Sequence, residues 1–168
     1  MEKELGIYVH IPFCKKRCSY CDFVSYAGKE DKIDQYFKAL KNEIETYNLK
    51  DYNVTTIYIG GGTPSFVDSK YIKEIIQKIN KGAIELTIEV NPGTITKQKI
   101  EEYKNCGINR LSIGLQSTND NLLKEIGRIH TYDEFLNTYK LAKEAGFENI
   151  NIDLMIGLPN QTIADLKH

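Results

Sequence analysis

The chain is organised around the stretch Cys14-Lys15-Lys16-Arg17-Cys18-Ser19-Tyr20-Cys21, in which three thiols follow a C-x3-C-x2-C spacing after an apolar run. Thiolates suit iron–sulfur clusters and zinc, and we expect so short a loop to bring all three sulfurs onto one concave surface. In a four-iron cluster, three thiolates leave one iron without a protein ligand. Catalytic metal sites keep an open position of this kind, so the loop predicts a metal centre with a free coordination site.

A structural zinc site is the alternative interpretation of the same loop. His10 lies four residues before Cys14, and zinc accepts three cysteines and one histidine as a ligand set. A spacing motif needs its structural context before it identifies a metal, so the triplet alone leaves iron–sulfur and zinc both open.

Composition limits the class of protein. The 168 residues are 41% hydrophobic and 27% charged, as in an ordinary soluble globular domain. The net charge of −1 provides no basic field, so nucleic acid is not the expected partner. No window approaches the ~18 apolar residues of a membrane span, and no signal peptide is evident at the N-terminus, so a cytoplasmic location is expected. Three cysteines within one short loop also favour metal binding over disulfides, while Cys106 is expected to be a small buried filler.

Hydrophobic periodicity predicts alternating strands and helices. Strands are predicted at residues 5–11, 54–59, 84–90, 111–116 and 150–155, and helices at 33–47, 69–79, 96–107, 122–126, 131–146 and from 162 onward. Expected capping residues are Asp31 for the first helix, Asp68 or Ser69 for the second, Gly107 after the third, and Thr131-Tyr132-Asp133-Glu134 as a capping box. Connections of this length give right-handed crossovers and a parallel sheet, of either barrel or doubly wound type.

A polar side on every predicted strand decides between the two types. The polar side chains are Tyr8, His10, Thr56, Tyr58, Glu85, Thr87, Glu89, Ser112, Gln116, Asn151 and Asp153. Strands buried on both faces have unbroken runs of apolar residues, so one face of this sheet must face a hydrated environment. A closed eight-stranded barrel fills its lumen with apolar layers and fits less well. The predicted fold class is therefore α/β, an open, partial parallel β/α barrel that is truncated after the fifth strand.

The ends of these strands carry the candidate functional residues. Cys14, Gly60–Pro64, Glu89, Gln116 and Asp153 each lie at or just after a strand end. In a β/α barrel these positions gather at the C-terminal rim, where active sites form. Glycine there lets the backbone approach a ligand closely, and carboxylates can accept hydrogen bonds from ligand amines or hydroxyls.

Structural roles for these residues are also possible. The glycine run is consistent with a plain turn. Glu89 and Asp153 are each consistent with a carboxylate that lines the barrel interior and pairs with a base. Arg128 and His130 follow a predicted helix end, where solvent exposure is the default expectation.

These motifs together resemble the radical S-adenosylmethionine (SAM) enzymes. The resemblance rests on Cys14, Cys18 and Cys21, the aromatic Tyr20, and Gly60-Gly61-Gly62-Thr63-Pro64. Further segments, at residues 8–14, 89–94, 109–117, 127–131 and 151–162, are similar to the oxygen-independent coproporphyrinogen III oxidase-like branch, which contains the dehydrogenase and the haem chaperone HemW. The similarity extends over essentially the whole chain.

The resemblance implies a [4Fe–4S] cluster on the three cysteines, with SAM chelating the fourth iron through its amino and carboxylate groups. One electron then cleaves SAM into methionine and a 5′-deoxyadenosyl radical. Carried over by position, the residues that look like contacts to the cluster-bound SAM are Tyr8, Gly61 and Glu89. Those that match a second SAM site are Tyr20, Gly62, Thr63, Gln116, Arg128 and Asp153.

Within the branch, one position favours the HemW-like proteins. The dehydrogenases typically carry a further cysteine two residues after the third ligand, whereas this chain has Phe23. The resemblance therefore favours a haem chaperone that delivers haem to respiratory enzymes, with the oxidative decarboxylation of coproporphyrinogen III as the alternative. Implied partners are haem or a porphyrinogen, an electron donor such as flavodoxin or ferredoxin, and a haem-accepting protein. Family members are longer, so residues 1–168 are expected to form an incomplete radical SAM core domain without its last strand and a C-terminal domain.

Overall fold

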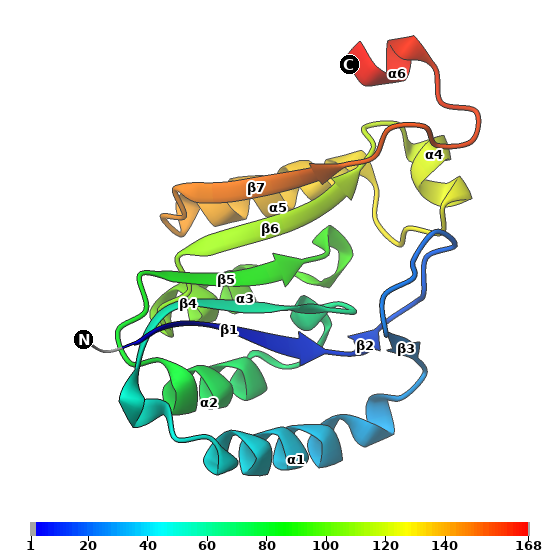
Figure 1. Ribbon diagram of the computed structural model, residues 1–168. Coiled ribbons are helices and arrows are strands. Elements are labelled where there is room, and N and C mark those ends of the chain that lie inside the picture. Colours follow the sequence, from blue (N-terminus) through cyan, green and yellow to red (C-terminus); the bar gives the residue numbers. More distant parts are fainter. Residues whose placement is uncertain (1–2, 168) are drawn as a thin grey trace.

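The computed structural model describes residues 3–167, which form a parallel sheet with helices (Figure 1). The strands are β1 (Lys3–Ile11), β2 (Phe13–Cys14), β3 (Tyr26–Ala27), β4 (Tyr52–Gly61), β5 (Glu85–Val90), β6 (Arg110–Gln116) and β7 (Asn149–Leu154). The α-helices are α1 (Ile33–Thr46), α2 (Ser69–Ile79), α3 (Lys97–Asn105), α4 (Asp120–Glu125), α5 (Tyr132–Glu144) and α6 (Ile163–Lys167). Short 3-10 turns lie at η1 (Glu30–Lys32), η2 (Leu49–Asp51), η3 (Pro64–Phe66) and η4 (Pro92–Thr94).

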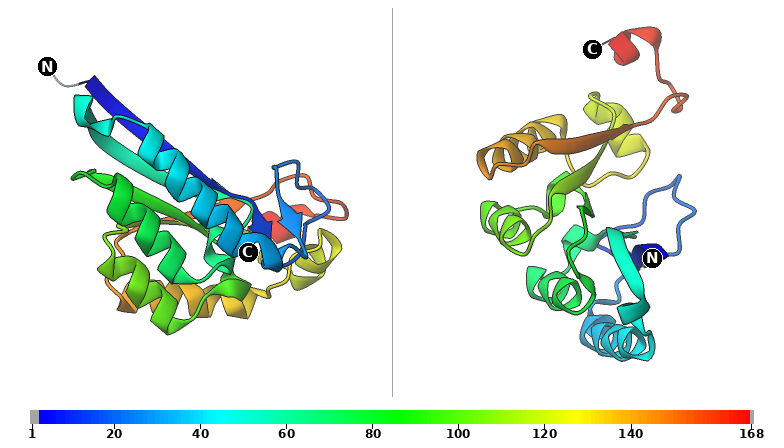
Figure 2. Two further views of the ribbon diagram at one scale, coloured as in Figure 1. Left: turned by 90° about the horizontal axis from the view of Figure 1, so that it is seen from below. Right: turned by 60° about the vertical axis from the view of Figure 1, so that its left-hand side comes forward.

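The main sheet has the strand order β1-β4-β5-β6-β7, and every neighbouring pair is parallel. Figure 2 shows α1, α2, α3 and α5 in an arc along one face of the curved sheet. A doubly wound sheet carries helices on both faces, whereas here the main helices share one. The prediction of an open, partial β/α barrel is therefore confirmed. Among the described residues, no helix is long and apolar enough to cross a membrane.

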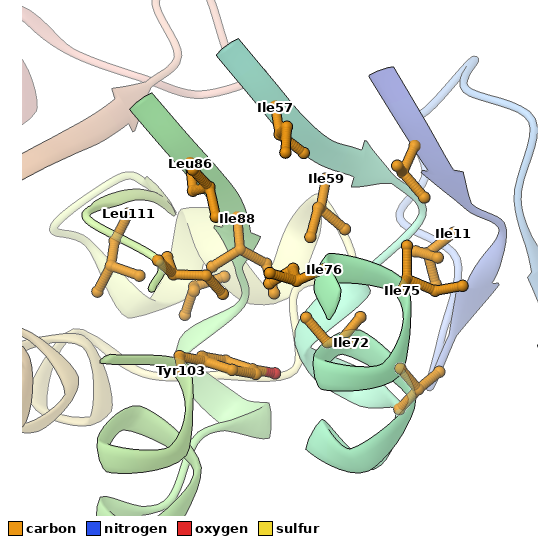
Figure 3. Packing of buried hydrophobic residues seen from close by; sticks show 14 of the residues in the cluster. Ile11, Ile57, Ile59, Ile72, Ile75, Ile76, Leu86, Ile88, Tyr103 and Leu111 are labelled. Carbon is orange, nitrogen blue, oxygen red and sulfur yellow. The ribbon is translucent and has the colours of Figure 1, made fainter. Parts of the chain in front are cut away.

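Apolar residues at alternate positions along the strands form the core between the sheet and the helices. Ile57 and Ile59 of β4 and Leu86 and Ile88 of β5 are buried against α2 and α3 (Figure 3). Burial of each such side chain contributes about 1.5–3 kcal/mol. The intervening residues of each strand face the opposite side, which places the polar residues on the open face of the sheet.

The helix caps explain where most helices begin. Asp68 and Thr96 accept backbone hydrogen bonds at the starts of α2 and α3, and Thr131 forms the predicted capping box of α5. The expectation that Asp31 caps α1 is wrong. The chain enters α1 through η1, so Asp31 lies inside that turn and pairs with Lys32 at 3.1 Å, while the N-cap position has no side-chain cap.

Cys106 follows α3 and packs against the core, as expected of a small filler, although it is only half-buried. Its thiol donates to the carbonyl of Tyr103 at 3.2 Å. The predicted Gly107 at the position after the C-cap has φ +97°, a conformation that glycine adopts without strain.

Candidate metal and cofactor site

A cavity of about 480 Å³ opens at the carboxyl ends of the strands, between the cysteine loop and the open face of the sheet. Every residue that the resemblance assigns to the cluster or to SAM lines it except Tyr8: Cys14, Cys18, Tyr20, Cys21, Gly61, Gly62, Thr63, Glu89, Gln116, Arg128 and Asp153. The parallel sheet brings these residues together because its strand ends share one edge.

The cysteine loop is closed at its base by an unpredicted pair of short strands. Residues Phe13 and Cys14 of β2 pair with Tyr26 and Ala27 of β3. Within the loop, Arg17 Nη2 donates to the carbonyl of Cys21 at 3.0 Å. All four cysteines of the chain are free thiols.

The three loop sulfurs share the cavity without being preassembled as ligands. Among residues 3–167, no three Cys, His, Asp or Glu side chains are grouped as a ready metal site. Cys14 is buried, whereas Cys18 and Cys21 are partly exposed. The expectation that the short loop brings the three sulfurs onto one concave surface is nevertheless met, because Cys14, Cys18 and Cys21 all line the cavity. Ligand closure around a metal is then coupled to metal binding.

The glycine run after β4 lies directly against Cys14. The hydroxyl of Thr63 donates to the Cys14 sulfur at 3.3 Å, and a Cβ at Gly62 would lie 2.9 Å from the same sulfur. The backbone N–H of Thr63 donates to the carbonyl of Phe13 at 2.9 Å. Burial raises the pKa of the Cys14 thiol, and the Thr63 hydrogen bond opposes that rise. The glycine run is thus more than a plain turn, since it lets the chain pass beside a candidate metal ligand.

His10 does not join the cysteines. Its Nε2 donates to the carbonyl of Val24 at 2.8 Å, and its Nδ1 lies 3.0 Å from the hydroxyl of Tyr8. Because Nε2 carries the proton, Nδ1 accepts from Tyr8. Both ring nitrogens are engaged within the chain, so the arrangement disfavours the Cys3His zinc site.

Glu89 is held by two donors at the cavity floor. The Tyr58 hydroxyl donates to Oε1 at 2.9 Å and the Gly61 N–H to Oε2 at 3.0 Å. Burial raises the pKa of Glu89, and both hydrogen bonds oppose the rise. Burial, together with the charge of Glu89, raises the pKa of Tyr58 to about 12, so the phenol keeps its proton. Tyr8 lies outside the cavity lining and stacks on Tyr58 with ring centroids 6.1 Å apart.

Asp153 is bound by neutral donors. Asn151 Nδ2 donates to Oδ1 at 2.7 Å, and the Ser112 hydroxyl donates to the same carboxylate at 3.3–3.4 Å. Neither Glu89 nor Asp153 has a base among its described hydrogen-bond partners, so the paired-with-a-base interpretation is wrong for both. Tyr58 and Ser112 line the cavity but were not singled out from the sequence, although their place on the polar side of their strands was a usable signal.

Gln116 ends β6 in an unusual conformation. Its φ is +72°, in the left-handed region, which costs a non-glycine residue about 1 kcal/mol or more. Strained backbone of this kind is concentrated at functional sites, and Gln116 lines the cavity.

Contrary to the expectation of solvent exposure, Arg128 is only partly exposed and His130 is buried. Arg128 Nη2 donates to the carbonyl of Gly114 at 2.5 Å, and Nη1 reaches the Tyr20 hydroxyl at 3.4 Å. His130 is 4% exposed, and burial, reinforced by the Arg128 charge, lowers its pKa to about 4. The segment after α4 turns inward to the end of the sheet, which a sequence without tertiary context does not reveal.

Comparisons with known proteins agree with this geometry. The family model of the radical SAM superfamily matches residues 8–168. The chain is 39% identical over 169 residues to the haem chaperone HemW of Bacillus subtilis (strain 168), covering 96% of this chain and 45% of that protein. It is 36% identical over 181 residues to the oxygen-independent coproporphyrinogen-III oxidase-like protein HemZ of the same strain, covering 100% of this chain and 36% of that protein.

Among solved structures, the coproporphyrinogen III oxidase HemN of Escherichia coli, a radical SAM enzyme, superimposes with a TM-score of 0.90. The sequence identity is 32%, and the match covers 99% of this chain and 40% of that one. The chain thus spans less than half the length of the relatives it matches. Its family is settled by the match of the superfamily model to nearly every residue: the chain belongs to the radical SAM superfamily.

Proposed function

We propose that Cys14, Cys18 and Cys21 hold a [4Fe–4S] cluster and that the adjoining cavity binds SAM. The observation that carries the proposal is that the three thiols and the polar strand ends line one cavity of about 480 Å³. The surroundings fit this group. Gly62 leaves the Cys14 sulfur uncovered on its side, and the Thr63 hydroxyl donates to that sulfur, as donors around cluster sulfurs do.

The cavity residues have separate proposed tasks. Glu89, held in a fixed orientation by Tyr58 and Gly61, keeps lone pairs free to accept from the amine of SAM. Tyr8 supports this group through its stacking on Tyr58. The proposed second set, Tyr20, Gly62, Thr63, Gln116, Arg128 and Asp153, surrounds the rest of the cavity and would contact a second SAM. When bound, the cluster and SAM supply reductive cleavage of SAM to a 5′-deoxyadenosyl radical.

We further propose that residues 1–168 are the incomplete radical SAM core of a HemW-like haem chaperone. The first of the relatives described above carries that name. The position of the extra cysteine of the dehydrogenases is occupied by Phe23, which is 69% exposed beside the cysteine loop and offers no thiol. In this proposal the protein is cytoplasmic, receives electrons from a flavodoxin or ferredoxin, and passes haem to an acceptor protein.

Anaerobic reconstitution with iron and sulfide tests the cluster. We expect a brown protein with thiolate-to-iron absorbance and about four irons per chain. Cys14→Ala, Cys18→Ala and Cys21→Ala should each lose the iron, whereas the control Cys106→Ser, at the far end of α3, should retain it. A colourless protein with one zinc per chain would overturn the proposal.

The second candidate function is oxidative decarboxylation of coproporphyrinogen III, favoured by the TM-score of 0.90 to HemN. Both activities should be assayed on one preparation of the whole protein, with cluster, SAM and reductant supplied. Haem binding without turnover supports the chaperone. Conversion of coproporphyrinogen III to protoporphyrinogen would establish the enzyme instead.

A further inference from the structure

The cysteine loop rests on a segment more than a hundred residues away in the sequence. The backbone N–H of Ser19 donates to the carbonyl of Ile126 at 3.1 Å, where α4 ends (Figure 1). A Cβ at Gly127 would lie 3.5 Å from the Ser19 nitrogen and 3.6 Å from the Cys18 Cα. The loop therefore packs directly on the end of α4.

Arg128 extends this contact into the sheet. Its Nη2 donates to the carbonyl of Gly114 in β6 at 2.5 Å. Its Nη1 lies 3.4 Å from the Tyr20 hydroxyl and 3.9 Å from the Cys18 sulfur. One rigid guanidinium thus joins the end of β6 to the middle of the cysteine loop, using the planar fork of donors that lysine lacks.

We infer that Arg128 is a positioning residue for the metal centre, which fastens the loop to β6 and places a positive charge beside the Cys18 sulfur. The inference rests on the proposed cluster and is compatible with the proposed SAM contact of Arg128, because the hydrogen bonds to Gly114 and Tyr20 use only two of the five N–H donors of the guanidinium. Hydrogen bonds and charge at the sulfurs set the reduction potential of iron–sulfur centres. A nearby positive charge stabilises the reduced form, so Arg128 raises the potential.

Loop attachment is tested first on the metal-free chain by hydrogen exchange of residues 15–21. Arg128→Gln should speed exchange about tenfold, because it removes hydrogen bonds that hold the loop closed. Arg128→Lys should speed it similarly, since an ammonium cannot bridge both sides. The matched control is Arg110→Gln, at the other end of the same strand, where the side chain reaches Thr87 at 3.4 Å and should leave the loop unaffected.

The potential is measured next on the reconstituted chain without SAM, so that a SAM contact cannot contribute. Arg128→Gln should shift the midpoint potential of the cluster to a more negative value. The midpoint potential of Arg128→Lys should stay near the wild-type value, and that of Arg110→Gln should equal it. Unchanged exchange in Arg128→Gln, an unchanged midpoint, or an equal shift in Arg110→Gln would each overturn the inference. If the wild-type chain takes up no cluster, the proposed function has failed, and the exchange experiment alone decides whether Arg128 fastens the loop.

Discussion

The Tyr58 hydroxyl donates a 2.9 Å hydrogen bond to Oε1 of Glu89, which orients the carboxylate at the floor of the cavity. The two residues lie on neighbouring strands, β4 and β5, whose parallel pairing sets Tyr58 beside Thr87, two residues before Glu89. A carboxylate held in this way meets a ligand without first losing its side-chain freedom.

Tyr58→Phe removes this donor while keeping the ring that stacks on Tyr8. We expect SAM to bind the cluster-loaded chain more weakly by about 1.5 kcal/mol, because a hydrogen bond to a charged group is lost and only the Gly61 N–H still orients the carboxylate. Isothermal titration calorimetry measures the change. Tyr52→Phe, at the exposed start of the same strand, is the control, and equal affinities of the two variants would contradict the prediction.

Glu89→Gln keeps the shape of the side chain but removes its charge. SAM binding should weaken by about 1.5–3 kcal/mol while iron and sulfide contents stay at the wild-type level, since Glu89 is not among the cluster ligands. Glu85→Gln changes a carboxylate on the same face of β5 at its other end and should have no effect. An unaltered affinity in Glu89→Gln would mean that the residue only lines the lumen.

Gly62→Ala tests how tightly the chain surrounds Cys14. The added Cβ would lie 2.9 Å from the Cys14 sulfur and 3.0 Å from the carbonyl oxygen of Phe13, and the backbone cannot yield easily there. We expect reduced iron incorporation and a loss of about 1–3 kcal/mol in the free energy of unfolding, as in other overpacked sites. Iron analysis and urea denaturation provide the measurements.

Gly93→Ala is the matched control for the glycine run. Its nearest contact would be the flexible Ile129 side chain at 3.3 Å, so iron uptake should remain normal. Full iron incorporation in Gly62→Ala would show that the loop has room to move aside.

The fold could be predicted from the sequence because the patterns that indicate strands and helices involve residues close together in the chain. The alternation of Ile88 with Thr87 and Glu89 reports the two faces of one strand, and Thr131 with Glu134 reports a helix start. Apart from β2 and β3, which were not predicted, the observed strands and α-helices begin and end within about two residues of the predicted ranges.

The contacts across the cavity were harder to predict from the sequence, because they depend on how segments far apart in the chain come together. Arg128 reaches Tyr20 across a separation of 108 residues, and His130 is buried although it follows a helix end. The pairing of Tyr58 with Glu89 was hidden for the same reason, since two polar strand residues contact each other only once the strand register is known.

Burial lowers the pKa of His130 from 6.5 to about 4. The folded chain therefore holds the ring neutral at pH values where the unfolded chain has protonated it. The resulting stability is fully present above pH 6.5 and is lost as the pH falls toward 4.

His130→Phe keeps an aromatic ring of similar shape but cannot take up a proton. Urea denaturation followed by circular dichroism should show the wild-type free energy of unfolding falling faster than that of His130→Phe between pH 6.5 and 4, by at most about 3 kcal/mol. Above pH 7 the two curves should run parallel. The control Asp165→Asn should not change the wild-type slope in this window, because the hydrogen bonds from Asn119 and Thr162 lower the pKa of Asp165 from 3.8 to about 2, and its contribution is lost only at lower pH. Parallel curves for wild type and His130→Phe down to pH 4 would show that the imidazole is protonated in the folded chain and that the end of the sheet admits water.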